Sequence, residues 1–345
     1  KLTKDTFIIS NGFKRPAYTQ GIVKLINEGF NCIPVIDDIT EIKAYEKIKR
    51  PFNVGIRIAT EEQPNFDFYT SRLGINPNKI VEFYKEKIKV NKNIKLKMLH
   101  FFINTGVQDN DYYWNELNKC LQVYVQLRKI CPTLDSLNIG GGFPIKSSLS
   151  FEWDYEYMAE GIVETIKKAC DEEDLPHPNL FTEFGSFTVG ESGIMLYSIL
   201  NQKQQNDREL WYMINNSFMT TLPDVWAIDQ RYPMLAINNW DKECQRVFLG
   251  GLTCDSEDFY NAEKHNNKIF LPKIGPKDKP LHLGFFYTGA YQESLSGYGG
   301  LKHCLIPAPK HIIITKPDED DQEEYVTKLF SKEQSAKSMM KILGY

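Results

Sequence analysis

The chain has 345 residues and carries 41 lysines and arginines against 45 aspartates and glutamates, a formal net charge of −4. Hydrophobic residues make up 42% and charged residues 25%, which is typical of a globular protein and excludes a disordered one. At roughly 150 residues per domain this length predicts about two domains, and the lack of a basic surplus argues against nucleic acid as a partner.

No apolar run approaches the roughly 18 residues of a membrane-spanning helix, and the first residues lack the apolar core of a signal peptide. We therefore expect a cytoplasmic protein without a membrane partner. The seven cysteines are scattered, odd in number and without a Cys-x-x-Cys pair. Reduced thiols and no metal site are the expectation from that pattern.

The first half of the chain alternates short β-rich runs with segments of helical periodicity, which is typical of consecutive βα units and a parallel sheet. Six strands are predicted, near residues 7–9, 32–36, 54–58, 97–103, 137–139 and 180–182. Helices are predicted between them, near residues 18–27, 40–49, 78–89, 112–130 and 151–170.

Beyond about Phe187 the pattern changes to strand-like runs separated by Gly, Pro and Asn, with an amphipathic helix near residues 328–343. We therefore predict two domains. Residues 1–186 would form a partial βα barrel, and residues 187–345 a mainly β domain with a terminal helix.

Six parallel strands suit an open doubly wound sheet as well as a (β/α)8 barrel. Polar and glycine residues directly follow the strands, as at barrel active sites, and no strand opens into a helix through a dinucleotide Gly-x-Gly-x-x-Gly motif. These features favour the barrel. A complete barrel needs eight units, so we expect that the first two βα units are missing from the N-terminus of this chain.

Two motifs in the first domain carry possible chemistry. Three glycines, Gly140, Gly141 and Gly142, follow a predicted strand and would let backbone N–H groups approach an anion such as a phosphate. The same glycines are compatible with a tight turn. Glu183, at the end of the last predicted strand, could hold a ring nitrogen protonated or be a structural acid paired with a lysine.

Two further motifs lie in the second domain. Cys254 and Asp255 combine a titratable thiol with a carboxylate able to recognise an ammonium group, although a lone cysteine is often a buried apolar residue. Tyr291 ends an aromatic segment with a Gly-Ala turn, and its phenol could donate to a phosphate oxygen or pack in the core.

Taken together, these motifs resemble the pyridoxal-phosphate-dependent decarboxylases of basic amino acids, which have an alanine-racemase-type barrel. They occur in the order Gly-Gly-Gly-Phe-Pro (140–144), Glu-x-Gly (183–185), Cys-Asp-Ser-x-Asp (254–258) and Gly-Ala-Tyr (289–291). The segments Asn-Gly-Phe-Lys (11–14), Leu-Pro-His-Pro (175–178) and Leu-Lys-His-Cys-Leu-Ile-Pro (301–307) look closest to bacterial biosynthetic arginine decarboxylases.

The resemblance implies pyridoxal 5′-phosphate as the cofactor, with Glu183 pairing with its pyridine nitrogen. The residues expected around the cofactor are Gly140, Gly141, Gly142, Gly185, Tyr291 and Thr105 near the phosphate, Phe102 on the ring and Arg57 as a support. Cys254 would protonate the substrate's Cα after CO2 leaves. Asp255 would bind the distal cationic group, with Asp229 as a second contact. In the family Cys254 and Asp255 reach the neighbouring subunit's site, which implies a homodimer with shared sites.

Three departures from the family pattern concern the cofactor. Phe102 stands where the family has a histidine that stacks on the ring, and Ser186 replaces an arginine that binds the phosphate. The family's cofactor-binding lysine lies on the first barrel strand, and no lysine of this sequence matches it; Lys14 lies in a later loop. We therefore expect this chain by itself to be inactive without an N-terminal segment.

The leading hypothesis is decarboxylation of arginine to agmatine and CO2 in polyamine biosynthesis. Asp255 favours a cationic substrate tail over the zwitterionic tail of diaminopimelate, but it does not separate guanidinium from ammonium. Ornithine, lysine and carboxyspermidine therefore stay open as substrates. Phe102 and Ser186 motivate a second hypothesis, a non-catalytic homologue that binds a partner. An amino-acid racemase on the same fold is less favoured, because the motifs at 254–258 and 289–291 follow the decarboxylase pattern.

Overall fold

The computed structural model describes residues 2–61, 70–103, 107, 110–262, 267–295, 301–316 and 325–345. The chain divides into two compact units. The first comprises Lys1–Pro144 and Trp153–Gly185, and the second comprises Ile145–Glu152 and Ser186–Tyr345. Each unit has its own hydrophobic core. No helix in these described residues combines the length and hydropathy needed to cross a bilayer.

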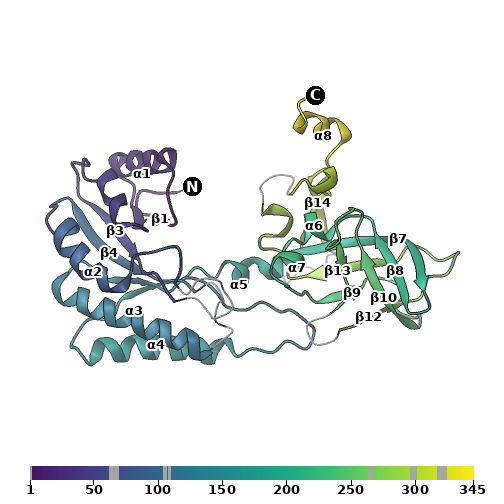
Figure 1. Ribbon diagram of the computed structural model, residues 1–345, viewed down its shortest axis with the longest axis horizontal. Helices are drawn as coiled ribbons and strands as arrows, with labels where there is room; N and C mark the ends of the chain where they lie inside the picture. Colours follow the sequence, from purple (N-terminus) through teal and green to yellow (C-terminus); the bar gives the residue numbers. More distant parts are fainter. Residues whose placement is uncertain are drawn as a thin grey trace. The chain divides into compact units, whose positions relative to one another are not determined.

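The first unit is built on six parallel strands, each paired with its successor in the chain (Figure 1). They are β1 (Ile8–Ser10), β2 (Cys32–Ile36), β3 (Phe52–Arg57), β4 (Ile94–His100), β5 (Ser136–Asn138) and β6 (Asn179–Phe181). All six lie where the sequence predicts strands. A doubly wound sheet reverses its strand order at a switch point, and this sheet runs from β1 to β6 without a reversal. The order is therefore that of a barrel segment.

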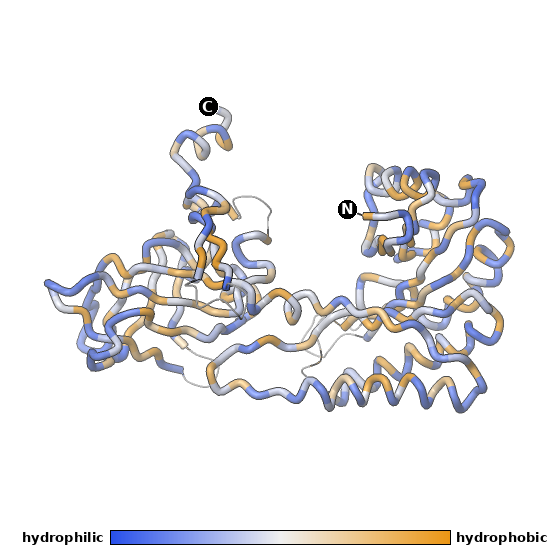
Figure 2. The backbone as a smooth tube through the Cα atoms, turned by 180° about the vertical axis from the view of Figure 1, so that it is seen from behind, coloured by the Kyte–Doolittle hydropathy of each residue, from blue (hydrophilic) through white to orange (hydrophobic). Residues whose placement is uncertain are grey.

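Helices connect these strands. They are α1 (Pro16–Glu28), the 3-10 helix η1 (Ile39–Ala44), α2 (Pro77–Phe83) with the π-helical turn η2 (Tyr84–Ile88), α3 (Asn110–Ile130) and α4 (Tyr155–Asp171). In α4 the residues Met158, Ile162, Ile166 and Cys170 are spaced by four and all buried. Hydrophobic and hydrophilic residues accordingly alternate along this helix (Figure 2).

The helix predicted over 40–49 forms as the 3-10 helix η1 and ends at Ala44, five residues early. Ile42, Tyr45 and Ile48 are all buried and recur every third residue. The N–H groups of Tyr45 and Ile48 each donate to the carbonyl three residues earlier, so turns of 3-10 type continue beyond η1. The Asp38 side chain accepts a hydrogen bond from the Thr40 N–H at 2.8 Å and fixes the start of η1.

The second unit contains a mixed seven-stranded sheet. Its strands are β7 (Ile194–Asn206), β8 (Glu209–Ile214), β9 (Met234–Ala236), β10 (Cys244–Gly250), β11 (Phe259–Tyr260), β12 (Ile269–Pro272) and β13 (His282–Phe286). Short helical turns lie before, between and after these strands, namely α5 (Gly185–Val189), η4 (Gly190–Ser192), α6 (Phe218–Thr221), α7 (Asp224–Ala227), η5 (Gln292–Ser294) and η6 (His303–Leu305). The core contains the rings of Phe218, Tyr260 and Phe285, whose centroids lie 5.1 to 5.8 Å apart.

The chain ends in a hairpin of β14 (His311–Thr315) and β15 (Val326–Ser331), followed by α8 (Ala336–Ile342). The helix predicted over 328–343 is therefore wrong in its first half. Residues Val326–Ser331 pair with β14 instead, and α8 begins only where the Ser335 hydroxyl accepts a hydrogen bond from the Ser338 N–H. The acidic run at residues 318–324 lies outside the described residues.

Candidate active site

Glu183 lies at the carboxyl edge of the first unit's sheet, two residues after the end of β6. Asn11 directly follows β1, and Asn138 ends β5, so the parallel arrangement brings all three side chains to one edge. The Asn11 amide donates to Glu183 Oε1 at 2.6 Å, and the Asn138 amide donates to the same oxygen at 2.8 Å. Within the described chain, Glu183 Oε2 makes no side-chain hydrogen bond.

Asn11 and Glu183 come from opposite ends of the strand order. They meet because the sheet is curled, and the rings of Phe7 and Phe181 also lie 5.3 Å apart. Both contacts join the region of the first strand to that of the last. The Glu183 carboxylate therefore has its geometry fixed from two strands at once.

Two basic residues end the neighbouring strands. His100 is almost fully buried, and this burial lowers its pKa well below the usual value despite the opposing effect of the Glu183 charge. His100 is therefore neutral at physiological pH. The Arg57 guanidinium is also buried and lies over the Phe102 ring at 5.7 Å from its centroid.

The glycine segment packs directly against Glu183. A Cβ on Gly141 would lie 2.5 Å from the Glu183 carbonyl oxygen, and a Cβ on Gly140 would lie 2.8 Å from the Phe101 carbonyl oxygen. The Gly140 carbonyl in turn accepts a hydrogen bond from the Glu183 N–H at 2.8 Å. These glycines therefore place the Glu183 backbone, a role that the motif alone does not reveal. A Cβ on Gly185, in contrast, would meet nothing within 4 Å.

Cys254 and Asp255 lie in the second unit, in the loop that follows β10. Buried Asp258 holds this loop: its carboxylate accepts hydrogen bonds from the Phe218 N–H at 2.8 Å and from the Thr253 N–H and hydroxyl at 2.9 and 2.6 Å. A Cβ on Gly251 would overlap that carboxylate. The loop conformation therefore depends on Asp258.

Replacing Asp258 with alanine is expected to lower the free energy of unfolding of the second unit by on the order of 3 kcal/mol, because several buried donors lose their acceptor. Chemical denaturation followed by tryptophan fluorescence measures this. The matched control is Glu257→Ala, an exposed carboxylate in the same loop, which is expected to leave stability nearly unchanged. Equal losses for the two variants would contradict the anchoring role of Asp258.

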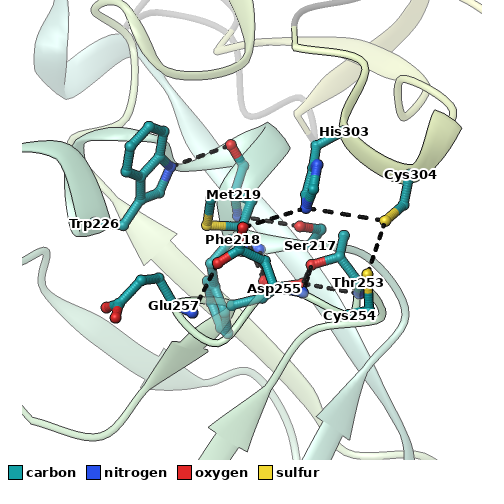
Figure 3. Close-up of polar contacts among 11 residues, drawn as sticks. Ser217, Phe218, Met219, Trp226, Thr253, Cys254, Asp255, Glu257, His303 and Cys304 are labelled. Atoms are coloured by element: carbon teal, nitrogen blue, oxygen red, sulfur yellow. Dashed lines mark hydrogen bonds and ion pairs between the residues drawn. The ribbon is translucent and has the colours of Figure 1, made fainter.

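The helical turn η6 places His303 and Cys304 beside this loop (Figure 3). Cys304 Sγ lies 3.8 Å from Cys254 Sγ and 3.9 Å from His303 Nε2. His303 Nε2 lies 3.5 Å from Asp255 Oδ2. The contact with the Cys304 thiol raises the pKa of Cys254, which favours the protonated thiol.

Asp229 and Tyr291, two further residues predicted for the site, are both largely exposed. The Asp229 side chain is 84% exposed, and its carboxylate forms an ion pair with Arg231 at 2.6 Å. Tyr291 is largely exposed and has a positive φ of 60°, at the end of a turn in which a Cβ on Gly289 would overlap the Val189 carbonyl oxygen. Thr105 lies outside the described residues. The roles predicted for these residues stay predictions.

Four residues of these clusters have no role predicted from the sequence: Asn11, Asn138, His303 and Cys304. Asn11 and Asn138 carry one signal, since both are polar residues at the carboxyl end of a predicted strand. For His303 and Cys304 there is no such signal, because some 50 residues separate them from Cys254. The described part of the chain has no group of three or more His, Cys, Asp or Glu residues placed to hold a metal ion.

Comparison with known proteins gives consistent matches. Residues 9–190 match the family described as "Pyridoxal-dependent decarboxylase, pyridoxal binding domain". The chain is 22% identical to a biosynthetic arginine decarboxylase of Prochlorococcus marinus, over 99% of this chain and 70% of that protein. It is 21% identical to arginine decarboxylase 1, chloroplastic, of Arabidopsis thaliana, over 91% of this chain and 58% of that protein.

Solved structures show the same fold. The biosynthetic arginine decarboxylase of Campylobacter jejuni superposes with a TM-score of 0.82 at 20% identity, covering 99% of this chain and 70% of that one. The diaminopimelate decarboxylase of Helicobacter pylori, complexed with L-lysine, gives a TM-score of 0.75 at 15% identity, covering 98% of this chain and 78% of that one. The predicted barrel followed by a mainly β domain is thereby confirmed.

Proposed function

Because the chain belongs to the pyridoxal-dependent decarboxylases, we propose that it removes the α-carboxylate of arginine as CO2 and yields agmatine. Family membership confirms the resemblance inferred from the motifs, pyridoxal phosphate as the cofactor, and decarboxylation as the reaction class. Arginine is supported by the names of the relatives, which are arginine decarboxylases of bacteria and plants. The observation that carries the proposal is the anchored Glu183 carboxylate.

The residues at the carboxyl edge of the first unit fit the cofactor. Glu183 has one oxygen held by two amides and a second oxygen without a partner in the described chain, which suits a protonated ring nitrogen. Asn11 Oδ1 is buried and accepts no hydrogen bond from the described residues. The space beside Gly185 is open for a larger group. When bound, the cofactor supplies the electron-accepting ring that allows CO2 to leave.

Glu183 would hold the ring nitrogen in its protonated form, and Asn11 and Asn138 would keep the carboxylate in place. Phe102, already covered on one side by Arg57, would offer an aromatic face to the ring. Gly140, Gly141, Gly142 and Gly185, with Tyr291, would surround the phosphate.

Cys254 would supply the proton that replaces the carboxylate on Cα, and Asp255 would bind the guanidinium of arginine. A thiol whose pKa is raised remains protonated at neutral pH and can therefore give up a proton when one is needed. Asp229 would be a second contact for the guanidinium.

Replacing Asp255 with asparagine is expected to lower kcat/KM for arginine about 100-fold, since a charge-assisted hydrogen bond becomes a neutral one. The isosteric neutral substrate L-citrulline serves as the control. The kcat/KM for citrulline is expected to change little, so the ratio of kcat/KM for arginine to that for citrulline should fall about 100-fold. An unchanged preference would show that another group binds the guanidinium.

The substrate is tested with the full-length protein loaded with pyridoxal phosphate. Release of labelled CO2 is measured from L-arginine, L-ornithine, L-lysine, carboxyspermidine and meso-diaminopimelate, and the amine is identified by mass spectrometry. Agmatine as the fastest product supports the proposal. A faster reaction with another amino acid would identify that amino acid as the substrate in place of arginine. No CO2 from any of them would contradict an enzymatic role.

The state of the cofactor has its own test. Borohydride fixes a lysine-bound cofactor covalently, so intact mass before and after reduction reports whether a lysine of the sample holds it. A gain of one reduced cofactor is expected where a lysine of the sample holds it, and no gain would contradict a lysine-bound cofactor in that sample.

We also propose a homodimer with shared active sites, located in the cytoplasm and serving polyamine biosynthesis. The β14–β15 hairpin supports association, because Ile314 and Phe330 are 60% and 70% exposed and Ile312 and Ile313 are nearly half exposed. Sedimentation equilibrium is expected to give twice the chain mass, and Ile314→Asp combined with Phe330→Asp is expected to shift the protein toward the monomer. A monomeric unmodified protein would contradict this proposal.

The free thiols suit a reducing compartment, which supports the proposed location in the cytoplasm.

A further inference from the structure

We propose that Cys254 and Cys304 form a reversible disulfide when the protein meets a peroxide, and that this bond withdraws the proton-donating thiol from the reaction. The covalent part concerns two thiols of one unit and is independent of the activity. Its effect on turnover rests on the proposed function, in which Cys254 is the proton donor.

The two sulfur atoms are already in contact. Cys254 Sγ and Cys304 Sγ lie 3.8 Å apart, on the loop after β10 and on η6 respectively (Figure 3). A disulfide needs about 2.05 Å between the sulfurs, so the two sulfurs must approach by about 1.8 Å for the bond to form. Both cysteines are exposed and unbonded in the single chain, and a thiol that meets the substrate in an active site is also open to small molecules such as peroxide and reductant.

The other cysteines differ from Cys254 and Cys304 in exposure or in their distance from another thiol. Cys32, Cys120, Cys131 and Cys170 are buried in the first unit, and their accessibility to an oxidant is low. Cys244 is exposed in the second unit, at the start of β10, and no sulfur contact is found for it among the described residues. Cys244 is therefore a matched control for exposure without a partner thiol.

The surroundings favour Cys304 as the thiol that reacts first. His303 Nε2 lies 3.9 Å from its sulfur and can take the thiol proton, which produces the nucleophilic thiolate. Asp255 Oδ2, at 3.5 Å from the same nitrogen, stabilises the imidazolium that results. Cys254 has no such base among the described contacts and is the resolving thiol.

The chemistry balances in two steps. The Cys304 thiolate attacks one peroxide oxygen, the O–O bond breaks, and the products are a sulfenic acid on Cys304 and one water. The Cys254 sulfur then attacks the Cys304 sulfur, the S–O bond breaks, and a second water leaves. In total, two thiols and one hydrogen peroxide give one disulfide and two waters, so the protein loses two hydrogens.

The experiment uses the full-length protein loaded with pyridoxal phosphate and treated with hydrogen peroxide. We expect a mass loss of about 2 Da, a cross-linked peptide pair containing Cys254 and Cys304, and a fall in agmatine formation of about 100-fold or more, since a general acid is lost. Dithiothreitol is expected to restore both the mass and the activity.

Three variants test the assignment of the two thiols. Cys244→Ser is expected to behave like the unmodified protein in mass and in activity. Cys304→Ser is expected to form no cross-link, and peroxide should instead add oxygen to Cys254 in steps of about 16 Da, with an activity loss that dithiothreitol reverses only in part. Cys304→Ala repeats the test with a side chain that cannot form hydrogen bonds.

The outcomes separate this inference from the proposed function. No mass loss, or a cross-link that maps to another pair, overturns the disulfide. A disulfide between these two residues that leaves the activity intact overturns the effect on turnover and the role of Cys254 as proton donor. A protein that forms the disulfide but never releases CO2 before treatment contradicts the proposed function alone.

Discussion

Replacing Glu183 with glutamine is expected to lower kcat for decarboxylation by on the order of 10³-fold, the scale seen when one electrostatic stabiliser is removed. Glutamine keeps an oxygen that Asn11 and Asn138 can still bind. It carries no negative charge, however, and cannot keep the ring nitrogen protonated. The geometry is therefore retained while the electron-accepting capacity of the ring is lost.

Rapid-mixing measurements of CO2 release give kcat, and the change in cofactor fluorescence gives its affinity. We expect the affinity of Glu183→Gln for pyridoxal phosphate to change far less than kcat. Glu191→Gln, an exposed carboxylate in η4, is the matched control and should retain normal turnover. A Glu183→Gln protein with kcat within tenfold of the unmodified protein would rule out the role given to this carboxylate.

Replacing Cys254 with alanine is expected to lower the rate of agmatine formation by about 10²- to 10⁴-fold, because a general acid positioned at Cα is lost. CO2 leaves before this proton is delivered. Part of the decarboxylated substrate should then leave as an aldehyde, with its amino group left on the cofactor, so that the ratio of agmatine to CO2 falls below one. A mutation that only misplaces the substrate would lower both products equally.

The two products are measured in the same reaction, one by trapped radioactivity and the other by mass spectrometry. Cys244→Ala removes an equally exposed thiol from the same unit and is expected to leave the ratio at one. A normal product ratio together with a normal rate in Cys254→Ala would require another proton donor. His303, 3.5 Å from Asp255, would then be the first residue to examine.

The strands of the first unit could be predicted from the sequence because their signals are local. Residues Cys32–Ile36 form a buried β-rich run between polar segments, and β2 occupies that run without a shift. The helix predicted at 40–49 forms as a 3-10 helix and ends at Ala44, because its buried residues recur every third position, a spacing that suits three residues per turn. In the C-terminal segment, pairing with β14 outweighed the helical periodicity of residues 328–331.

The candidate site could be predicted only where a motif holds neighbouring residues together. Motifs of this kind single out Glu183 and the glycines at 140–142, which lie together in the structure and whose roles stay predictions. The hydrogen bond from Asn11 spans 172 positions, and the contact between Cys254 and Cys304 spans 50. Such pairs depend on the curvature of a sheet and on the path of a loop, and no single segment of the sequence encodes either.

The bond between Asn11 and Glu183 joins the first and last strands of the curled sheet, and this has a consequence for cooperativity. Strand β1 has three residues and one strand neighbour, so on its own it would exchange its amide hydrogens through frequent local opening. The hydrogen bond from Asn11 to Glu183 links this opening to the residue proposed to pair with the ring nitrogen of the cofactor. A ligand bound to the Glu183 carboxylate would therefore slow hydrogen exchange in β1. A protein that loses this carboxylate would lose the protection of the β1 amides as well as its catalytic activity.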